Sequence, residues 1–201
     1  MKPIMKSINN GTYVSKLLKG HIIDKYKYYY GANILPNPDK FIYIEDSSGF
    51  CSCLGLTFAS DRKLFSEQYL DWPVQNYIND YTSEHCDIRS KVLEVGSLIS
   101  IKKGFGSKLY AMIPFIANEY NADYVLITLT SKGQDILCAF GFEMQYLVDS
   151  DKRLVSSGSK WGTFYDSSPK TYILNVSKNL LGKNIKQYAN ELGLEIKNRL
   201  I

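Results

Sequence analysis

The chain has 201 residues, of which 45% are hydrophobic and 22% are charged, and its formal net charge is +4. This length and composition are typical of a globular domain with a substantial core, and so small a positive excess does not indicate a nucleic-acid-binding protein. No apolar run reaches the roughly 18 residues of a transmembrane helix, so we expect no integral membrane insertion.

The amino-terminal half is predicted to form a helix and then a hairpin. Residues 1–20 contain no continuous apolar stretch and do not resemble a secretion signal. Residues 13–31 have a helical pattern that becomes rich in tyrosine. The strand-like runs 41–46 and 50–60 flank a Ser48-Gly49 turn, and short helices are expected over 64–70 and 74–82.

The four cysteines lack the spacing of metal ligands, so we expect free thiols, no metal and a cytoplasmic location.

The carboxyl-terminal half alternates between strand and helix patterns. We expect strands at 91–100, 123–130 and 144–150, helices at 107–120 and 131–141, and a last strand over 161–176. Together these elements predict one mixed α/β (α+β) domain over 1–177. Residues 178–201 are predicted to form a basic amphipathic helix. It would pack on the domain or a homodimer partner, or dock an acidic carrier protein or an anionic membrane surface.

The segment KKGFGSKL, residues 102–109, joins a predicted strand to a predicted helix. Glycines allow a backbone to approach phosphates closely, and the following helix presents its positive end. The alternative is a turn that serves only packing. With the surrounding strand and helix order, this loop resembles the GCN5-related acetyltransferase superfamily.

The GCN5-related resemblance implies a mixed central sheet flanked by helices. It also implies that Lys103, Gly104, Phe105, Gly106, Ser107 and Lys108 hold the pyrophosphate of coenzyme A. Two positions depart from the pattern: Ile101 replaces an arginine or glutamine, and Leu137 replaces a tyrosine that is often the general acid.

A second resemblance covers residues 25–176. The blocks YYYGANI (28–34), LFSEQYLDWPVQNYI (64–78), VLEVGSL (92–98), DYVLITLT (123–130) and WGTFYDSSP (161–169) occur in the order of the thermostable hemolysin family. That family is similar in outline to acyl-homoserine-lactone synthases. The resemblance implies an acyl-CoA or acyl carrier protein thioester as donor and a small amine or hydroxyl compound as acceptor.

Two carboxylates are candidates for catalysis. Glu94 interrupts an apolar strand, and a buried carboxylate with a raised pKa suits a general base. The alternative is a structural carboxylate bonded to backbone or to Arg89. Glu67 lies in the LFSEQYL block, where a solvated helix face is the alternative.

The aromatic blocks supply the remaining candidates. Tyr165 is a candidate acid in place of Leu137, or else a core strand residue. Tyr30, Ser97, Trp161 and Asp166 are candidate substrate-binding residues.

Three functions of different class are compatible with these features: an acyltransferase, a ligand-binding or regulatory module on the same fold, and a direct cytolysin, as the family name says. The sequence shows no export signal or membrane-spanning pattern typical of a pore former.

Overall fold

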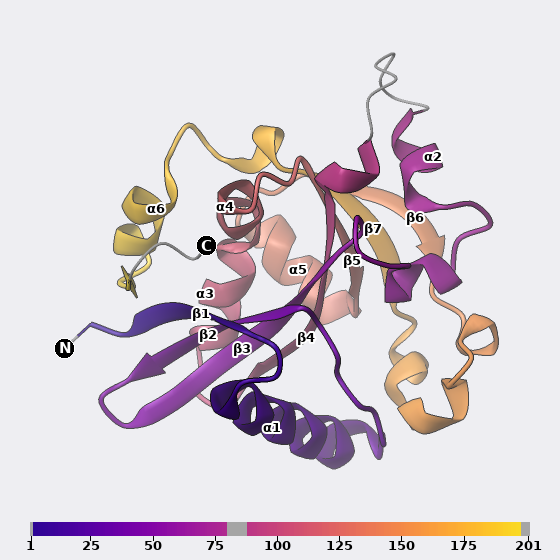
Figure 1. Cartoon of the computed structure of the whole chain (residues 1–201), viewed down its shortest axis with the longest axis horizontal. Helices are drawn as coiled ribbons and strands as arrows, with labels where there is room; N and C mark the ends of the chain where they lie inside the picture. Colours follow the sequence, from indigo (N-terminus) through magenta and orange to yellow (C-terminus); the bar gives the residue numbers. More distant parts are fainter. Residues whose placement is uncertain (1, 80–87, 198–201) are drawn as a thin grey trace.

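One mixed eight-stranded sheet runs through the computed structural model, which describes residues 2–79 and 88–197. The strands are β1 (Ile4–Asn9), β2 (Lys40–Asp46), β3 (Gly49–Phe58), β4 (Val92–Ser100), β5 (Tyr124–Leu129), β6 (Gln145–Asp149), β7 (Lys170–Asn175) and β8 (Glu195–Ile196). Their order across the sheet is β6-β7-β5-β4-β3-β2-β1-β8 (Figure 1). The β4–β5 and β1–β8 pairs are parallel and the other neighbours antiparallel. The predicted mixed α+β class is confirmed.

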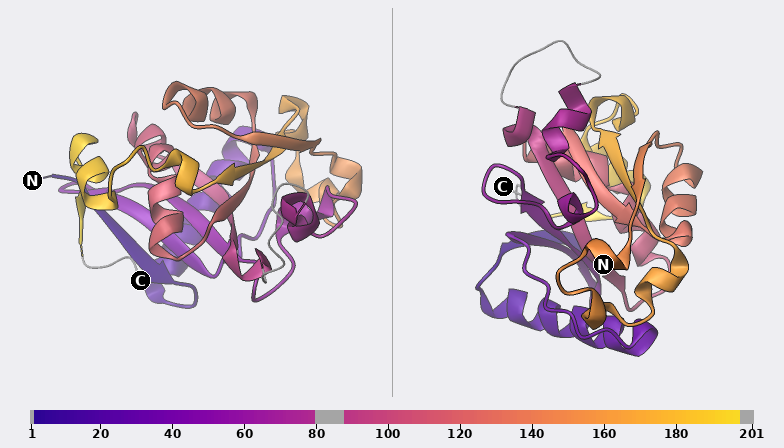
Figure 2. Two further views of the ribbon diagram at one scale, coloured as in Figure 1. Left: turned by 90° about the horizontal axis from the view of Figure 1, so that it is seen from above. Right: turned by 90° about the vertical axis from the view of Figure 1, so that its right-hand side faces the viewer.

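In the part of the chain that the structure describes, six α-helices cover the two faces of this sheet. They are α1 (Tyr13–Tyr30), α2 (Val74–Asn79), α3 (Phe105–Ala111), α4 (Ile113–Glu119), α5 (Ser131–Ala139) and α6 (Ile185–Glu191). Helix α1 lies on one face, away from α3 and α5 on the other (Figures 1 and 2). Among the described residues, no helix combines the length and apolar character needed to cross a bilayer.

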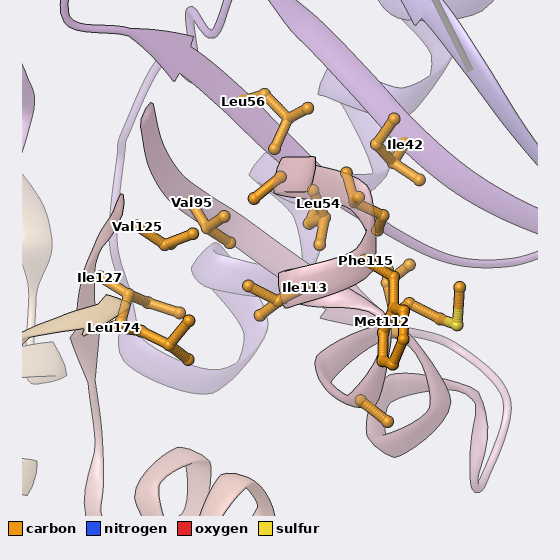
Figure 3. Close-up of a cluster of buried hydrophobic side chains, with 14 of the residues drawn as sticks. Ile42, Leu54, Leu56, Val95, Met112, Ile113, Phe115, Val125, Ile127 and Leu174 are labelled. Carbon is orange, nitrogen blue, oxygen red and sulfur yellow. The ribbon is translucent and has the colours of Figure 1, made fainter. Parts of the chain in front are cut away.

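The largest apolar core lies between the sheet and the helices α3 to α6. Side chains from β2, β3, β4, β5 and β7 meet those of the helices there, with Met112, Ile113 and Phe115 at its centre (Figure 3). The opposite face carries two smaller clusters. One lies under α1, and the other lies under α2 and the 3-10 helix η1 (Phe65–Gln68). This division leaves room for a cavity between α1 and η1.

Helix α1 is defined at both ends by capping residues. The Thr12 side chain accepts a hydrogen bond from the Ser15 amide, and Gly31 ends the helix in the left-handed conformation at φ 62°. Leu18 and Ile22 on its inner face are buried against the sheet. The predicted helix over 13–31 is therefore confirmed.

The predicted helix over 107–120 is divided into α3 and α4 at Met112. Pro114 has no amide hydrogen and so cannot donate to the carbonyl of Tyr110, which interrupts the helical ladder. Of the predicted helix over 74–82, α2 accounts for 74–79, and residues 80–82 lie outside the described part of the chain, as do His85 and Cys86.

The carboxyl-terminal prediction was wrong in its secondary structure. Residues 178–197 contain only the end of a 3-10 turn, the short α6 and β8, which pairs with β1. Leu181, Gly182 and Gly193 have positive φ angles, so a continuous helix cannot pass through them. The tail nevertheless packs on the domain, because Ile185 and Tyr188 are buried in its largest core.

The whole segment 161–176 was predicted to be the last strand of the sheet, but residues 161–169 do not form a strand. They form 3-10 turns, Gly158–Trp161 and Phe164–Ser167, and only Lys170–Asn175 is a strand.

Candidate active site

A cavity of about 740 Å³ lies on the α1 side of the sheet. Its walls come from four parts of the chain that are far apart in sequence: residues 33–38, residues 62–69, the middle of β4, and residues 156–164. The predicted motif blocks therefore converge on one place. Arg62, Lys63 and Lys160 line the cavity, and Glu94 is the acidic residue in its lining. The cavity thus combines a carboxylate with three cationic side chains.

A β-bulge opens the sheet beside this cavity. Strand β4 pairs with β5 from Val92↔Tyr124 to Val95↔Ile127, and β5 then continues past this paired stretch to Leu129. Ser97 has a φ of 53°, and the register of β4 against β3 shifts next to it. A second cavity of about 90 Å³ fills the space between the diverging strands. Ser97 lines both cavities, so the two cavities adjoin each other at the bulge.

Glu94 lies on the wall of the large cavity because strand residues alternate between faces. Leu93 and Val95 enter the main core, and Glu94 faces the α1 side. Its carboxylate accepts hydrogen bonds from the Phe65 amide at 2.8 Å, the Ser66 amide at 2.8 Å and the Ser66 hydroxyl at 2.5 Å. Burial raises the pKa of Glu94, while these donors oppose the rise. The predicted contact of Glu94 with backbone amides is therefore present, whereas Arg89 pairs with Glu67 and not with Glu94.

A chain of four hydroxyls extends from Glu94 across the sheet. Ser66 Oγ lies 2.8 Å from Thr128 Oγ1, which lies 2.8 Å from Thr171 Oγ1, which in turn lies 2.9 Å from Ser150 Oγ. Each hydroxyl has one proton, and that of Ser66 goes to Glu94. Thr128 must then donate to Ser66, Thr171 to Thr128 and Ser150 to Thr171. All four dipoles therefore stabilise the ionised carboxylate.

Glu67 belongs to a separate ion pair. It is buried, and it accepts from Arg89 Nη1 at 2.7 Å, Arg89 Nη2 at 3.1 Å, the Leu64 amide at 2.7 Å and the Val74 amide at 3.0 Å. Burial raises the pKa of Glu67, but these four bonds outweigh it and lower the pKa overall. Glu67 lies outside the lining described for the large cavity, and it joins η1 to the start of α2. It is neither on a solvated face nor directed at the cavity.

The aromatic candidates form a wall at one end of the cavities. Trp161 lines the large cavity and Tyr30 the small one. Tyr69 lines the large cavity and Tyr165 does not, but the Tyr165 hydroxyl lies 2.7 Å from the Tyr69 hydroxyl. Burial is the largest cause of a raised pKa in both tyrosines. Asp166 is exposed, outside the lining of both cavities as the structure describes them.

The Trp-Gly and Tyr-Gly-Ala blocks contact each other directly. The Thr163 amide donates to the Tyr30 carbonyl at 2.9 Å, and the Asn33 amide donates to the Lys160 carbonyl at 2.6 Å. Gly162 has a φ of 54°, and a Cβ atom there would lie 1.8 Å from the Tyr30 oxygen. Glycine is therefore required at this position by the close approach of the two blocks.

The glycine loop follows β4, as predicted. Gly104 has a φ of 84° and begins α3, and a Cβ atom at Gly106 would lie 3.1 Å from Ser100 Cβ. Lys108 Nζ lies over the Phe105 ring, 5.4 Å from its centroid. Residues 103–108, all described, lie outside the linings of both cavities.

Lys102 cannot serve as a free cation in this loop. Its ammonium contacts both Asp46 carboxylate oxygens, at 2.6 and 2.7 Å, and the Ser48 hydroxyl. The β2–β3 hairpin thus neutralises it.

Several residues of the site were not predicted from the sequence. Ser66 lies next to Glu67, which was singled out, and Thr128 interrupts the apolar β5 run. A polar residue in an otherwise apolar strand was the available signal for Thr128. Lys63 and Lys160 gave no signal, since exposed lysines are common.

Comparison with known proteins identifies the family and the fold. Residues 10–180 match the model of a family described as thermostable hemolysin. No curated protein matches the sequence. The structure of the CoA-dependent acyl-homoserine lactone synthase BjaI with SAM and isopentyl-CoA is similar with a TM-score of 0.61 at 7% identity, covering 97% of this chain and 93% of that one.

Two further solved structures have the same architecture. FeeM, an N-acyl amino acid synthase from uncultured soil microbes, has a TM-score of 0.58 at 11% identity, with 92% and 98% of the two chains covered. TofI, in a ternary complex with an inhibitor and MTA, has a TM-score of 0.57 at 12% identity, with 97% and 98% covered. At such identities the likeness shows the fold, which is that of acyl-homoserine lactone synthases and of the GCN5-related type.

Proposed function

Because the chain belongs to the thermostable hemolysin family and has the fold of acyl-homoserine lactone synthases, we propose that it is an acyltransferase. The donor would be an acyl-CoA or an acyl carrier protein thioester, and the acceptor a small amine or hydroxyl compound. The observation that carries the proposal is the bulge at Ser97, which opens the sheet beside a cavity with Glu94 on its wall.

The residues present fit a thioester donor. Strands β4 and β5 separate beyond Val95, and the small cavity lies between them and shares Ser97 with the large one. Gly104 and Gly106 leave the backbone at the start of α3 without side chains, as close contact with phosphates requires. We assign residues 103–108 to phosphate contacts, and Tyr30, Ser97 and Trp161 to the acyl and acceptor groups. Bound there, the donor would supply the activated acyl carbon.

Glu94 is the base in this proposal. A carboxylate with a raised pKa and a place on the cavity wall can take a proton from an acceptor amine as that amine attacks the acyl carbon. The hydroxyl chain stabilises its charged form before the attack. Tyr69, which lines the cavity and whose hydroxyl contacts that of Tyr165, would hydrogen-bond the departing thiolate.

Binding and turnover are tested separately with the purified full chain. A panel of acyl-CoAs of increasing length is added, and thermal unfolding is followed together with mass spectrometry of products formed with a mixture of amino compounds. At a ligand concentration of about 100 times the dissociation constant, the stabilisation should be about 2.7 kcal/mol. Glu94→Gln should keep this stabilisation and lose product formation by about 100-fold or more.

A binding module without turnover is the second candidate, and one observation favours it. Leu137, where the superfamily often has a tyrosine acid, is fully buried in the core. Stabilisation by acyl-CoA without product would support this alternative. If neither acyl-CoA nor acyl carrier protein thioesters stabilise the protein or are consumed by it, the acyltransferase proposal is wrong.

A further inference from the structure

Large apolar side chains exposed to solvent gather on and beside helix α1. Of the ten such side chains found in the described part of the chain, five lie between residues 13 and 35. They are Tyr13, Leu17, Tyr28, Tyr29 and Leu35, and Tyr28 and Leu35 are 81% and 80% exposed. Half of the exposed apolar residues thus occur in about a tenth of the chain. A concentration of this kind marks an interaction surface.

Three of these residues form a stripe along the outside of α1. Tyr13, Leu17 and Tyr28 are separated by 4 and 11 residues, which are close to whole numbers of helical turns. The inner side of the same helix packs Leu18 and Ile22 on the sheet. Helix α1 therefore has apolar residues on both sides, and its outer side faces away from the molecule (Figure 2). We call Tyr13, Leu17, Tyr28 and Leu35 the outer face.

The charges around the outer face are mainly positive. Helix α1 contains four lysines and one acidic residue, Asp24, which is exposed and at 100° per residue lies within the stripe between Leu17 and Tyr28. Lys16 and Lys27 are exposed, and at 100° per residue they lie beside the stripe. Tyrosine and leucine flanked by lysine are typical of a helix that lies in the surface of a membrane containing anionic lipids.

A second copy of the chain fits this face less well. In a two-fold symmetric contact the same patch meets itself, so the positive charges of Lys16 and Lys27 on one copy would approach those of the other copy. An anionic lipid surface instead brings opposite charges together, and tyrosine is well suited to the boundary between headgroups and acyl chains.

The outer face adjoins the mouth of the large cavity. Residues 33–38, which follow α1 directly, form part of the cavity wall, and Leu35 both lines the cavity and is exposed. We propose that the outer face of α1 docks the protein peripherally on an anionic membrane surface, with the cavity mouth beside the lipid. This docking goes beyond acyl transfer and does not depend on it.

Vesicle flotation with the full chain tests the proposal. Vesicles of phosphatidylcholine alone are compared with vesicles containing about one-third phosphatidylglycerol. We expect binding to the anionic vesicles that weakens as salt is added. Leu17→Ser combined with Tyr28→Ser should reduce the partition coefficient about tenfold or more. The matched control Leu154→Ser removes a similarly exposed leucine, 53% against 50% for Leu17, and should leave binding within about twofold.

The charge contribution has its own control. Lys16→Gln and Lys27→Gln should each reduce binding to anionic vesicles about fivefold at low salt. Lys186→Gln, at an exposed lysine of α6, should leave it unchanged. Circular dichroism of each variant establishes that it is folded.

Three results would overturn the proposal. One is the failure of the native chain to float with anionic vesicles. Another is an equal loss of binding in the Leu154→Ser control. The third is a concentration-dependent dimer, seen by sedimentation, that Leu17→Ser and Tyr28→Ser abolish, because the occupant would then be a second copy. Failure of acyl transfer with intact vesicle binding would leave the docking proposal standing.

Discussion

Replacing Glu67 by glutamine should separate a structural role from a catalytic one. The side chain of Glu67 is 1% exposed, and its two oxygens accept four hydrogen bonds, two of them from Arg89. Glutamine has the same shape but a single oxygen. Its amide nitrogen would point two hydrogens at the donors that one carboxylate oxygen now satisfies, and the charge facing Arg89 would be lost.

The expected loss is large on the scale of protein stability. Hydrogen bonds to charged groups contribute about 1.5–3 kcal/mol each, and breaking a buried ion pair costs about 3–5 kcal/mol. Because two of the four bonds of Glu67 come from Arg89 and belong to one ion pair, we take the second figure, about 3–5 kcal/mol, for Glu67→Gln. The free energy of unfolding of a folded domain is about 5–15 kcal/mol, so the variant should be severely destabilised.

Urea denaturation followed by fluorescence measures this loss. Glu191→Gln is the matched control, because the Lys183–Glu191 pair has the same 2.7 Å separation as Arg89–Glu67 but is 38% and 50% exposed. Glu191→Gln should lower the free energy of unfolding by no more than about 1 kcal/mol. A loss below about 1 kcal/mol for Glu67→Gln, with an unchanged denaturant slope, would refute the reasoning and return Glu67 to the catalytic candidates.

The remaining predictions concern acid stability, a close backbone approach and the hydroxyl chain. Since the folded pKa of Glu67 is lowered, its contribution is complete above the unfolded value of about 4.3 and should disappear as the pH falls through the folded pKa. Urea titrations at several pH values, with Glu67→Gln as reference, measure this, and identical pH profiles would contradict it. Gly162→Ala should lose about 3 kcal/mol or more, because its Cβ would lie 1.8 Å from a backbone oxygen. Gly20→Ala, with no atom within 4 Å, should instead stabilise helix α1 by about 0.5–1 kcal/mol, and equal effects would show that the contact is unimportant. Thr171→Val interrupts the hydroxyl chain and should raise the pKa of Glu94, measured by NMR of labelled glutamate carboxyls; an unchanged pKa would show that the chain does not act on Glu94.

The order of most elements was predictable because periodicity depends on local sequence. Strand β4 and the carboxylate within it follow from an apolar run that Glu94 interrupts, and the β2–β3 hairpin follows from the Ser48-Gly49 turn. The prediction of a carboxyl-terminal helix was wrong, also for a local reason. Leu181 with Gly182, and Gly193, adopt positive φ angles, and the apolar spacing around them imitates a helical face.

Partner choice in the candidate site could not be predicted, because it depends on distances across the fold. Arg89 was a possible partner of Glu94, yet it pairs with Glu67, 22 residues before it in the chain. Lys102 directly precedes the predicted phosphate loop, yet its ammonium lies against Asp46 on the neighbouring hairpin.

The sequence by itself determined most of the elements, their order and the blocks that belong to one family, because these depend on local propensity and spacing. Only the tertiary structure decided that residues 33–38, 62–69 and 156–164 meet around Glu94 in one cavity. It also decided that α1 presents a second apolar stripe to the outside. Burial and hydrogen-bond partners arise when distant segments pack, and no local pattern encodes which of them will meet.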